Sequence, residues 1–299
     1  MGLTEVHCMK RLLALLSMVL VVGCSSLGGG SILPHSKLSN SEMIAQEGGS
    51  TVALITYRDD KETTVTTGYR PFCTGVWVDA THILTADHCA KGEQRNLQKR
   101  LDARKAANGE APKTLQEMLQ RLFGGKSGPD EADVVEEMGM SVHYILEKEV
   151  VEVGKEPSAW HLSKVVAFDE DHDLALLEVV GKAVPAHKVA RLADATPAVG
   201  EHVNIVGQPI GMYWTYVQGN VSAYRGKDMM PNREGPWMQV AAPVWFGNSG
   251  GGCFNDYGEL VGIADWIKDA PLMSFFVHLD SIRTFLDNSK TEAATAAKK

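Results

Sequence analysis

Residues 246–251 read Phe-Gly-Asn-Ser-Gly-Gly, so that Ser249 stands in a short segment with glycines on both sides. Glycine permits backbone conformations that other residues avoid, and it lets backbone N–H groups come close to a bound group. Taken alone, such a segment predicts a turn. It indicates a nucleophile only if the chain also supplies a base, because a serine hydroxyl is a weak nucleophile at neutral pH.

Two other segments supply a base and an acid. Residues 84–89 read Leu-Thr-Ala-Asp-His-Cys, which places His88 directly after an expected strand. Residues 171–177 read Asp-His-Asp-Leu-Ala-Leu-Leu, in which Asp171 and Asp173 precede an apolar strand. A histidine can take the proton of a serine hydroxyl, and a buried carboxylate can fix the tautomer of that histidine. The three segments together indicate a nucleophilic serine, with either aspartate as the acid.

In their order and local sequence, these segments resemble the chymotrypsin-like (trypsin-fold) serine proteases. The similarity is closest to the protease domain of bacterial HtrA/Deg enzymes, and it extends to residues 164–168, 206–211 and 218–222. It implies an all-β fold of two six-stranded antiparallel β-barrels with a helical insertion and a short C-terminal helix. Because about 50 residues follow Ser249, we expect no PDZ domain behind the protease domain.

The resemblance implies a role for each matching residue. His88 corresponds to the general base, Ser249 to the nucleophile, and Asp173, which stands immediately before the apolar strand, to the orienting acid. The backbone amides of Gly247 and Ser249 correspond to the oxyanion hole. Asp87 replaces the small residue that usually precedes the histidine, and we expect its side chain in solvent rather than against the base.

The same family implies where a specificity pocket lies. Its base stands six residues before the serine, which is Pro243 in this chain. Its walls correspond to Ala264, Asp265, Trp266, Phe275 and Phe276. Since Pro243 is uncharged, we expect cleavage after a small or medium apolar residue rather than after Lys or Arg. Asp265 stands where the family usually has serine, and its charge argues against an apolar pocket.

The cysteines are few, and their positions are informative. Cys73 and Cys89 match a disulfide that, in chymotrypsin relatives, joins the histidine loop to a neighbouring strand. Cys253 has no evident partner and is expected to be a small buried residue. Asn248 stands where zymogens of the family carry an aspartate that pairs with a freed N-terminus. We therefore expect no N-terminal cleavage to be needed for activity.

Short stretches rich in β-branched and aromatic residues recur along the chain and predict many strands. The expected strands are residues 51–57, 63–69, 75–78, 82–86, 142–153, 164–168, 174–180, 202–206, 217–224, 237–243, 260–266 and 273–278. A closing helix is expected over residues 280–286, in a protease domain of residues 50–288, and a disordered tail over residues 289–299.

One charged stretch, residues 92–137, interrupts the β pattern. Thr114 and Glu117 have the spacing of a capping box, and an apolar stripe follows over residues 115–123. We expect this helical insertion either to pack on the outside of the first barrel or to form a lid or exosite beside His88.

The N-terminal residues resemble a bacterial lipoprotein leader. A basic pair at residues 10–11 precedes an apolar run at residues 12–22, which is too short to cross a bilayer because a spanning helix needs about 20 residues. The run ends in Val-Val-Gly-Cys at Cys24. This resembles a lipobox, in which signal peptide 1–24 is removed and the cysteine is lipidated; the alternative is a frayed helix with an incidental cysteine. Residues 25–49 are expected to form a flexible tether.

Composition excludes several other classes of protein. The 299 residues are 44% apolar and 22% charged, as in soluble globular proteins. A formal net charge of −8 provides no basic surface for phosphates, so nucleic acid is not an expected partner. The remaining histidines stand singly, without the spacing of metal ligands, and no phosphate-binding loop is present. We expect no metal and no cofactor.

These observations predict a serine endopeptidase anchored by lipid in the bacterial cell envelope, on the periplasmic face or at the outer membrane. Its partners would be protein or peptide substrates and, through the lipid, a membrane. The alternative is a lipoprotein that keeps the trypsin fold as a catalytically silent scaffold for binding peptides.

Overall fold

A computed structural model of the chain describes residues 36–58, 68–92, 143–147, 161–179, 186–229, 233–268 and 272–296. Residues 37–299 form a unit distinct from residues 1–36. The expected signal peptide with Cys24, the first part of the expected tether and nearly all of the expected insertion lie outside the described residues.

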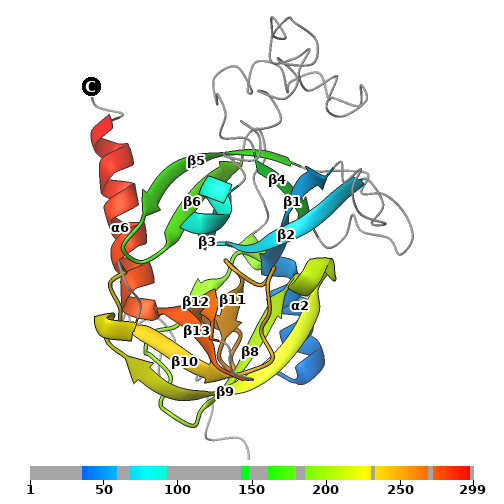
Figure 1. Cartoon of the computed structure of the whole chain (residues 1–299), viewed down its shortest axis with the longest axis vertical. Coiled ribbons are helices and arrows are strands. Elements are labelled where there is room, and N and C mark those ends of the chain that lie inside the picture. The colour runs from blue at the N-terminus through cyan, green and yellow to red at the C-terminus, as the bar shows by residue number, and fades with distance from the viewer. Residues whose placement is uncertain are drawn as a thin grey trace, which may run out of the picture. The chain divides into compact units, whose positions relative to one another are not determined.

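The N-terminal part of this unit is a closed barrel of six strands in the order β1-β2-β3-β6-β5-β4 (Figure 1). All its strand pairs are antiparallel. The strands are β1 (Thr51–Arg58), β2 (Gly68–Trp77), β3 (His82–Ala86), β4 (His143–Glu147), β5 (His161–Asp169) and β6 (Leu174–Val179). Neighbouring residues on a strand point to opposite faces, and one face of each strand fills the barrel. Val52, Leu54, Trp77, Ile83 and Leu177 are buried in its core.

The C-terminal part is a sheet of seven strands in the order β11-β8-β9-β10-β13-β12-β7. The strands are β7 (Arg191–Leu192), β8 (His202–Gly207), β9 (Thr215–Arg225), β10 (Trp237–Ala241), β11 (Gly252–Phe254), β12 (Glu259–Ile267) and β13 (Ser274–His278). Because β11 also pairs with β12, six of these strands close into a ring, and β7 pairs in parallel with β12 outside it. The predicted all-β fold with antiparallel barrels is confirmed, and β7 is an addition to it.

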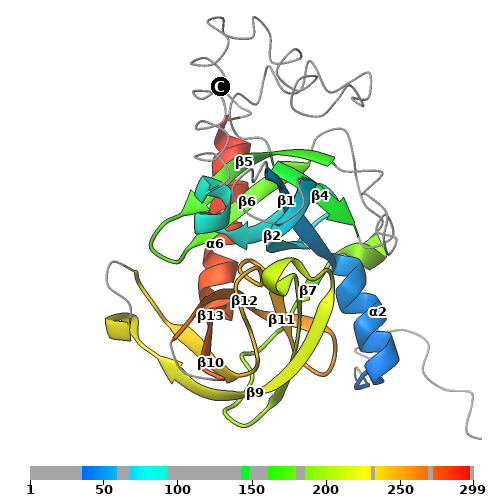
Figure 2. The same ribbon diagram turned by 45° about the vertical axis from the view of Figure 1, so that its right-hand side comes forward.

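The short helices are η2 (Ala186–Lys188), η3 (Pro209–Gly211) and η4 (Lys227–Met229), and the long ones are α2 (Asn40–Ser50) and α6 (Leu279–Ala296). α6 contacts β5 of the first barrel and both β12 and β13 of the second (Figures 1 and 2). Its Leu279, Ile282 and Phe285 are buried, which is the spacing expected of one apolar helix face. α6 therefore packs against both barrels. None of the helices in the described ranges is long and apolar enough to cross a membrane.

Both helices correct an expectation. α2 occupies the C-terminal part of the expected tether, because Ser39 and Glu42 form a capping box that starts a helix despite the glycines near its end. α6 continues to Ala296, so the expected disordered tail is helical up to that residue.

The strands differ from prediction at β2 and β11. Most of the expected strand 63–69 lies outside the described residues. The expected strand 75–78 belongs to a longer strand, β2, which accommodates Pro71 at a bulge where Leu54 faces Cys73 and Ile55 faces Pro71. Proline lacks the N–H that a regular ladder requires, and a bulge tolerates it. β11 was not predicted, since its three residues adjoin a glycine-rich turn.

Glu47 in α2 is fully buried, and neither of its carboxylate oxygens has a hydrogen-bond partner among the described residues. Burial, reinforced by the charge of Asp256, raises the pKa of Glu47 to about 9. The folded protein therefore holds a proton that the unfolded chain releases above about pH 4.5. The stability that depends on this proton is present below that pH and is lost as the pH rises towards 9.

Replacement Glu47→Gln should therefore stabilise the fold at pH 8, by on the order of 5 kcal/mol, because an amide needs no proton to be neutral. At pH 4 the gain should vanish. Urea unfolding at the two pH values measures the difference, and the exposed Glu234→Gln is the matched control. A gain of equal size at both pH values would contradict the argument.

Candidate active site

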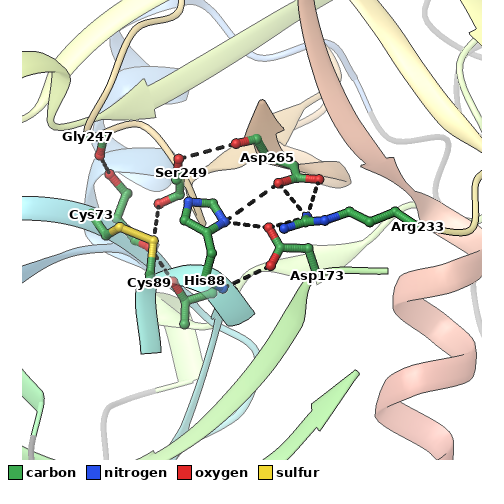
Figure 3. Close-up of a disulfide and its surroundings, with 10 residues drawn as sticks. Cys73, His88, Cys89, Asp173, Arg233, Gly247, Ser249 and Asp265 are labelled. Atoms are coloured by element: carbon green, nitrogen blue, oxygen red, sulfur yellow. Dashed lines mark hydrogen bonds and ion pairs between the residues drawn. A yellow bond between two sulfur atoms is a disulfide. The ribbon is translucent and has the colours of Figure 1, made fainter. Parts of the chain in front are cut away.

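His88 lies on a helical turn, residues 87–92, that follows directly on β3. The next residue, Cys89, forms a disulfide with Cys73 of β2, with the two Cα atoms 6.2 Å apart (Figure 3). The bond closes a loop with a sequence separation of 16 residues, which contributes about 3 kcal/mol in the chain-entropy treatment. The predicted disulfide is present, and it ties the histidine turn to its neighbouring strand.

Asp173 is the aspartate that the fold brings to His88. Its side chain is buried, and Oδ2 lies 2.5 Å from Nδ1 of His88 while Oδ1 accepts the His88 backbone N–H at 2.8 Å. Its φ of +54° places it in the left-handed region, at the end of the turn that leads into β6. Asp171 is exposed on the same turn. Of the two candidate acids, Asp173 is therefore the one that contacts the imidazole.

The ionisation of Asp173 fixes the tautomer of the histidine. Burial opposes its charge, yet the hydrogen bond from His88 and the guanidinium of Arg233 hold the pKa of Asp173 well below its usual range. Because an ionised carboxylate can only accept, Nδ1 of His88 carries the proton and donates it. Nε2 is then unprotonated in the neutral ring and free to act as a base.

Ser249 lies on the turn before β11. The backbone conformation of this turn depends on two glycines. Gly247 has a φ of +102°, and a Cβ there would lie 2.2 Å from the carbonyl oxygen of Gln208. Gly250 has a φ of +82°, and a Cβ would lie 2.1 Å from Oγ1 of Thr85. No side chain fits at either position. The Ser249 hydroxyl donates to the main-chain oxygen of Asp265 at 3.3 Å (Figure 3). Both His88 and Ser249 line one cavity.

The peptide groups on both sides of Gly247 are held from outside the turn. The carbonyl of Phe246 accepts the N–H of Ile210 at 2.7 Å. The carbonyl of Gly247 accepts the hydroxyl of Thr74 at 2.8 Å. These bonds fix the orientation of the Gly247 amide. The oxyanion role of Gly247 and Ser249 stays a prediction.

The cavity has a volume of about 900 Å³. Four of the predicted pocket residues line it, namely Pro243, Ala264, Asp265 and Trp266. Most of its remaining wall is apolar and is formed by Val244, Trp245, Phe246, Ile267, Leu272 and Met273. A largely apolar cavity therefore adjoins Ser249, and its charged lining residues are Arg233, Asp265 and Lys268.

Phe276 corrects the predicted pocket. It is fully buried in the core of the second sheet and is not among the residues that line the cavity. Phe275 stacks on Trp266 with ring centroids 3.9 Å apart, so it supports the wall from behind. Both faces of β13 are buried, since adjacent residues point to opposite sides and each side meets a core.

The carboxyl group of Asp265 is not unpaired in the cavity, because the guanidinium of Arg233 pairs with it. Nη1 of Arg233 lies 3.0 Å from each carboxylate oxygen of Asp265 and 2.5 Å from Oδ2 of Asp173. Burial and the neighbouring Asp173 raise the pKa of Asp265 well above its usual range, whereas the guanidinium acts in the opposite direction. Arg233 belongs to no sequence motif, so it was not identified from the sequence.

The sequence of residues 73–263 matches the trypsin-like peptidase domain family. The chain belongs to this family. Serine protease HTRA1 of Xenopus tropicalis is 30% identical over 169 residues, which cover 54% of this chain and 36% of the relative. The probable periplasmic serine endoprotease DegP-like of Pseudomonas fluorescens is 38% identical over 101 residues, which cover 34% of this chain and 21% of the relative. The predicted resemblance to HtrA/Deg proteases is confirmed.

These matches concern only part of each relative, because the chain spans about a third or less of the length of the curated relatives it matches. Among solved structures, the fold is similar to that of Rv3671c from M. tuberculosis, in the inactive form of a serine-to-alanine mutant. The TM-score is 0.51 at 15% identity, and the match covers 86% of this chain and 95% of that chain. At this identity, the likeness concerns the fold.

Asp87 departs from the family pattern beside the histidine, and the expectation that its side chain lies in solvent is wrong. Its side chain is buried and pairs with Lys91 of the same helical turn at 2.9 Å. Lys91 also contacts Glu170. The ion pair compensates the buried charge of Asp87.

Cys253 is as expected, and Asn248 makes a hydrogen bond within its own turn. Cys253 is buried and unpaired, and burial raises the pKa of its thiol well above the usual value. Asn248 is also buried, and its side-chain amide donates to the carbonyl of Trp245 at 3.0 Å. The asparagine is thus used inside its own turn.

Proposed function

We propose that the chain is a serine endopeptidase that hydrolyses peptide bonds through Ser249, His88 and Asp173. The observation that carries the proposal is the imidazole of His88, which is held by the buried Asp173 at 2.5 Å and lines one cavity with Ser249. Membership in the trypsin-like peptidase domain family supports it, and so do relatives named as serine proteases.

In this reaction, the Ser249 hydroxyl first leaves its hydrogen bond with the Asp265 carbonyl and turns towards His88. Nε2 takes the hydroxyl proton as Oγ bonds to the carbonyl carbon of the substrate. The imidazolium is stabilised by Asp173 and passes its proton to the leaving amine. An acyl group stays on Ser249 until a water attacks it. The imidazole takes a proton from this water and returns it to Oγ of Ser249 as the acid is released.

The backbone amides of Gly247 and Ser249 would stabilise the negative oxygen of each tetrahedral intermediate. Such donors act strongly because they are already oriented when charge develops. The hydrogen bonds that hold the Phe246 and Gly247 carbonyls support this role, since they fix the amide between them.

The substrate class follows from the cavity beside Ser249. Pro243 and the apolar wall offer no counter-charge for a basic side chain, and Arg233 and Asp265 already pair with each other. We infer a preference for a small or medium apolar residue on the acyl side of the cleaved bond.

The site of action is proposed to be the bacterial cell envelope, with a lipid on Cys24 as the anchor. The matched DegP-like relatives are named as periplasmic, which supports the compartment. The lipid itself rests on the lipobox resemblance.

The full chain should react with a fluorophosphonate probe and cleave peptides after alanine, valine or leucine at least tenfold faster than after arginine. Ser249→Ala should abolish both, because the probe bonds to the nucleophilic oxygen. Ser222→Ala, an exposed serine on β9, is the matched control and should leave both unchanged. A folded parent chain that neither reacts nor cleaves would support the alternative, a silent peptide-binding scaffold.

A further inference from the structure

A second carboxyl group stands beside the proposed catalytic acid. Asp265 of β12 is buried, and its Oδ1 lies 3.7 Å from Nδ1 of His88, the atom that Asp173 also contacts (Figure 3). His88, Asp173 and Asp265 are close enough together to hold a metal ion. The cation that contacts both carboxyls is instead a side chain of the protein, the guanidinium of Arg233.

Arg233 comes from the connection between β9 and β10 of the second barrel. The next residue, Glu234, donates its backbone N–H to the carbonyl of Asp171 at 2.8 Å. That carbonyl belongs to the turn of the first barrel that carries Asp173. The connection is thus attached to the acid-bearing turn, and the attachment brings Arg233 to both carboxyls.

The charge balance around the imidazole indicates an electrostatic role for Arg233. Negative charge near a histidine favours the imidazolium, which has no lone pair to take a proton. Arg233 places one positive charge against the ionised Asp173, so its loss would leave the negative charge beside His88 uncompensated. The other charged side chains nearby form separate ion pairs, in which Lys91 pairs with both Asp87 and Glu170. The balance at His88 therefore depends on Arg233.

We propose that Arg233 is a positioning residue of the active site, which compensates the negative charge beside His88 and holds Asp173 in place against the imidazole. The proposal rests on the proposed function for its kinetic consequences. Its electrostatic consequence can be measured whether or not the protein cleaves peptides.

The first test follows the protonation of His88 by NMR of the imidazole nitrogens in the full chain carrying Ser249→Ala. Adding Arg233→Gln should move the titration midpoint of His88 to higher pH by about one unit, since a positive charge is lost beside the ring. Arg233→Lys keeps the charge and should return the midpoint most of the way to the parent value. Arg225→Gln removes an exposed arginine of β9 that binds Gln239, and should leave the midpoint unchanged.

The second test uses kinetics with Ser249 intact. Arg233→Gln should lower kcat at pH 7 at least tenfold, change KM less than threefold, and move the acidic limb of the pH profile upwards. Asp265→Asn removes the second carboxyl, so the double variant Arg233→Gln/Asp265→Asn should be no worse than Arg233→Gln alone. A merely structural arginine would lower activity at all pH values alike.

Two results would overturn the proposal. One is a His88 midpoint that stays within 0.3 pH unit of the parent in Arg233→Gln while thermal unfolding shows a folded chain. The other is a double variant whose loss is the product of the single losses. If the midpoint moves as expected but the parent chain cleaves no peptide, the endopeptidase function fails and the role of Arg233 stands.

Discussion

Alanine in place of His88 or Ser249 should each lower kcat/KM on a peptide substrate by about 10⁴- to 10⁶-fold, and alanine at both positions should lower it little further. The nucleophile without its base cannot lose its proton, and the base without the nucleophile has no proton to take. Each single change therefore disables the whole unit. Cleavage rates of a peptide with leucine on the acyl side of the cleaved bond compare the three variants with the parent.

The chain offers a matched control for the histidine. His172 also pairs with an aspartate through Nδ1, at 2.8 Å from Asp169, but it does not line the cavity that holds Ser249. His172→Ala should leave kcat/KM within about threefold of the parent, a range usual for surface substitutions. If the double loss at His88 and Ser249 equalled the product of the single losses, the two residues would not act as one unit.

Local sequence was sufficient to find three of the residues that meet at the site. His88, Asp173 and Ser249 each lie in a short segment. The identities of the adjacent residues are constrained by the local structure. Cys89 must reach Cys73, an apolar strand must start after Asp173, and Gly247 and Gly250 must adopt positive φ. Such constraints leave a pattern that can be read without the fold.

The parts of the site that were missed depend on distant segments. Arg233 reaches Asp173 only because the β9–β10 connection is attached to a turn of the other barrel. Nothing around Arg233 in the sequence marks that contact. The pairing also explains how Asp265 can lie in a largely apolar cavity, which the sequence left as a conflict.

Other differences have equally specific causes. The pattern of β13 could not show that Phe276 faces a core, because both faces of this strand are covered. α2 did carry a signal, the capping box of Ser39 and Glu42, but the glycines that follow favoured a tether. Tertiary burial of Met43 stabilises the helix.

The choice between the two candidate acids gives the second large effect. Asp173→Asn should lower kcat by about 10⁴-fold, because an amide cannot carry the charge that stabilises the imidazolium. Its NH₂ group can also donate to Nδ1 of His88, which moves the ring proton to Nε2 and removes the base. The loss should stay below that of Ser249→Ala, since the nucleophile and the imidazole are both retained.

Asp171→Asn should change kcat less than about threefold, as expected for an exposed side chain. Its carbonyl, which accepts the Glu234 N–H, is unaffected by a change of side chain. The two variants differ by two positions on one turn and remove the same charge, so a general effect of net charge would lower both alike. Steady-state kinetics at pH 7 with both purified variants decides, and a larger loss for Asp171→Asn would reverse the assignment of the acid.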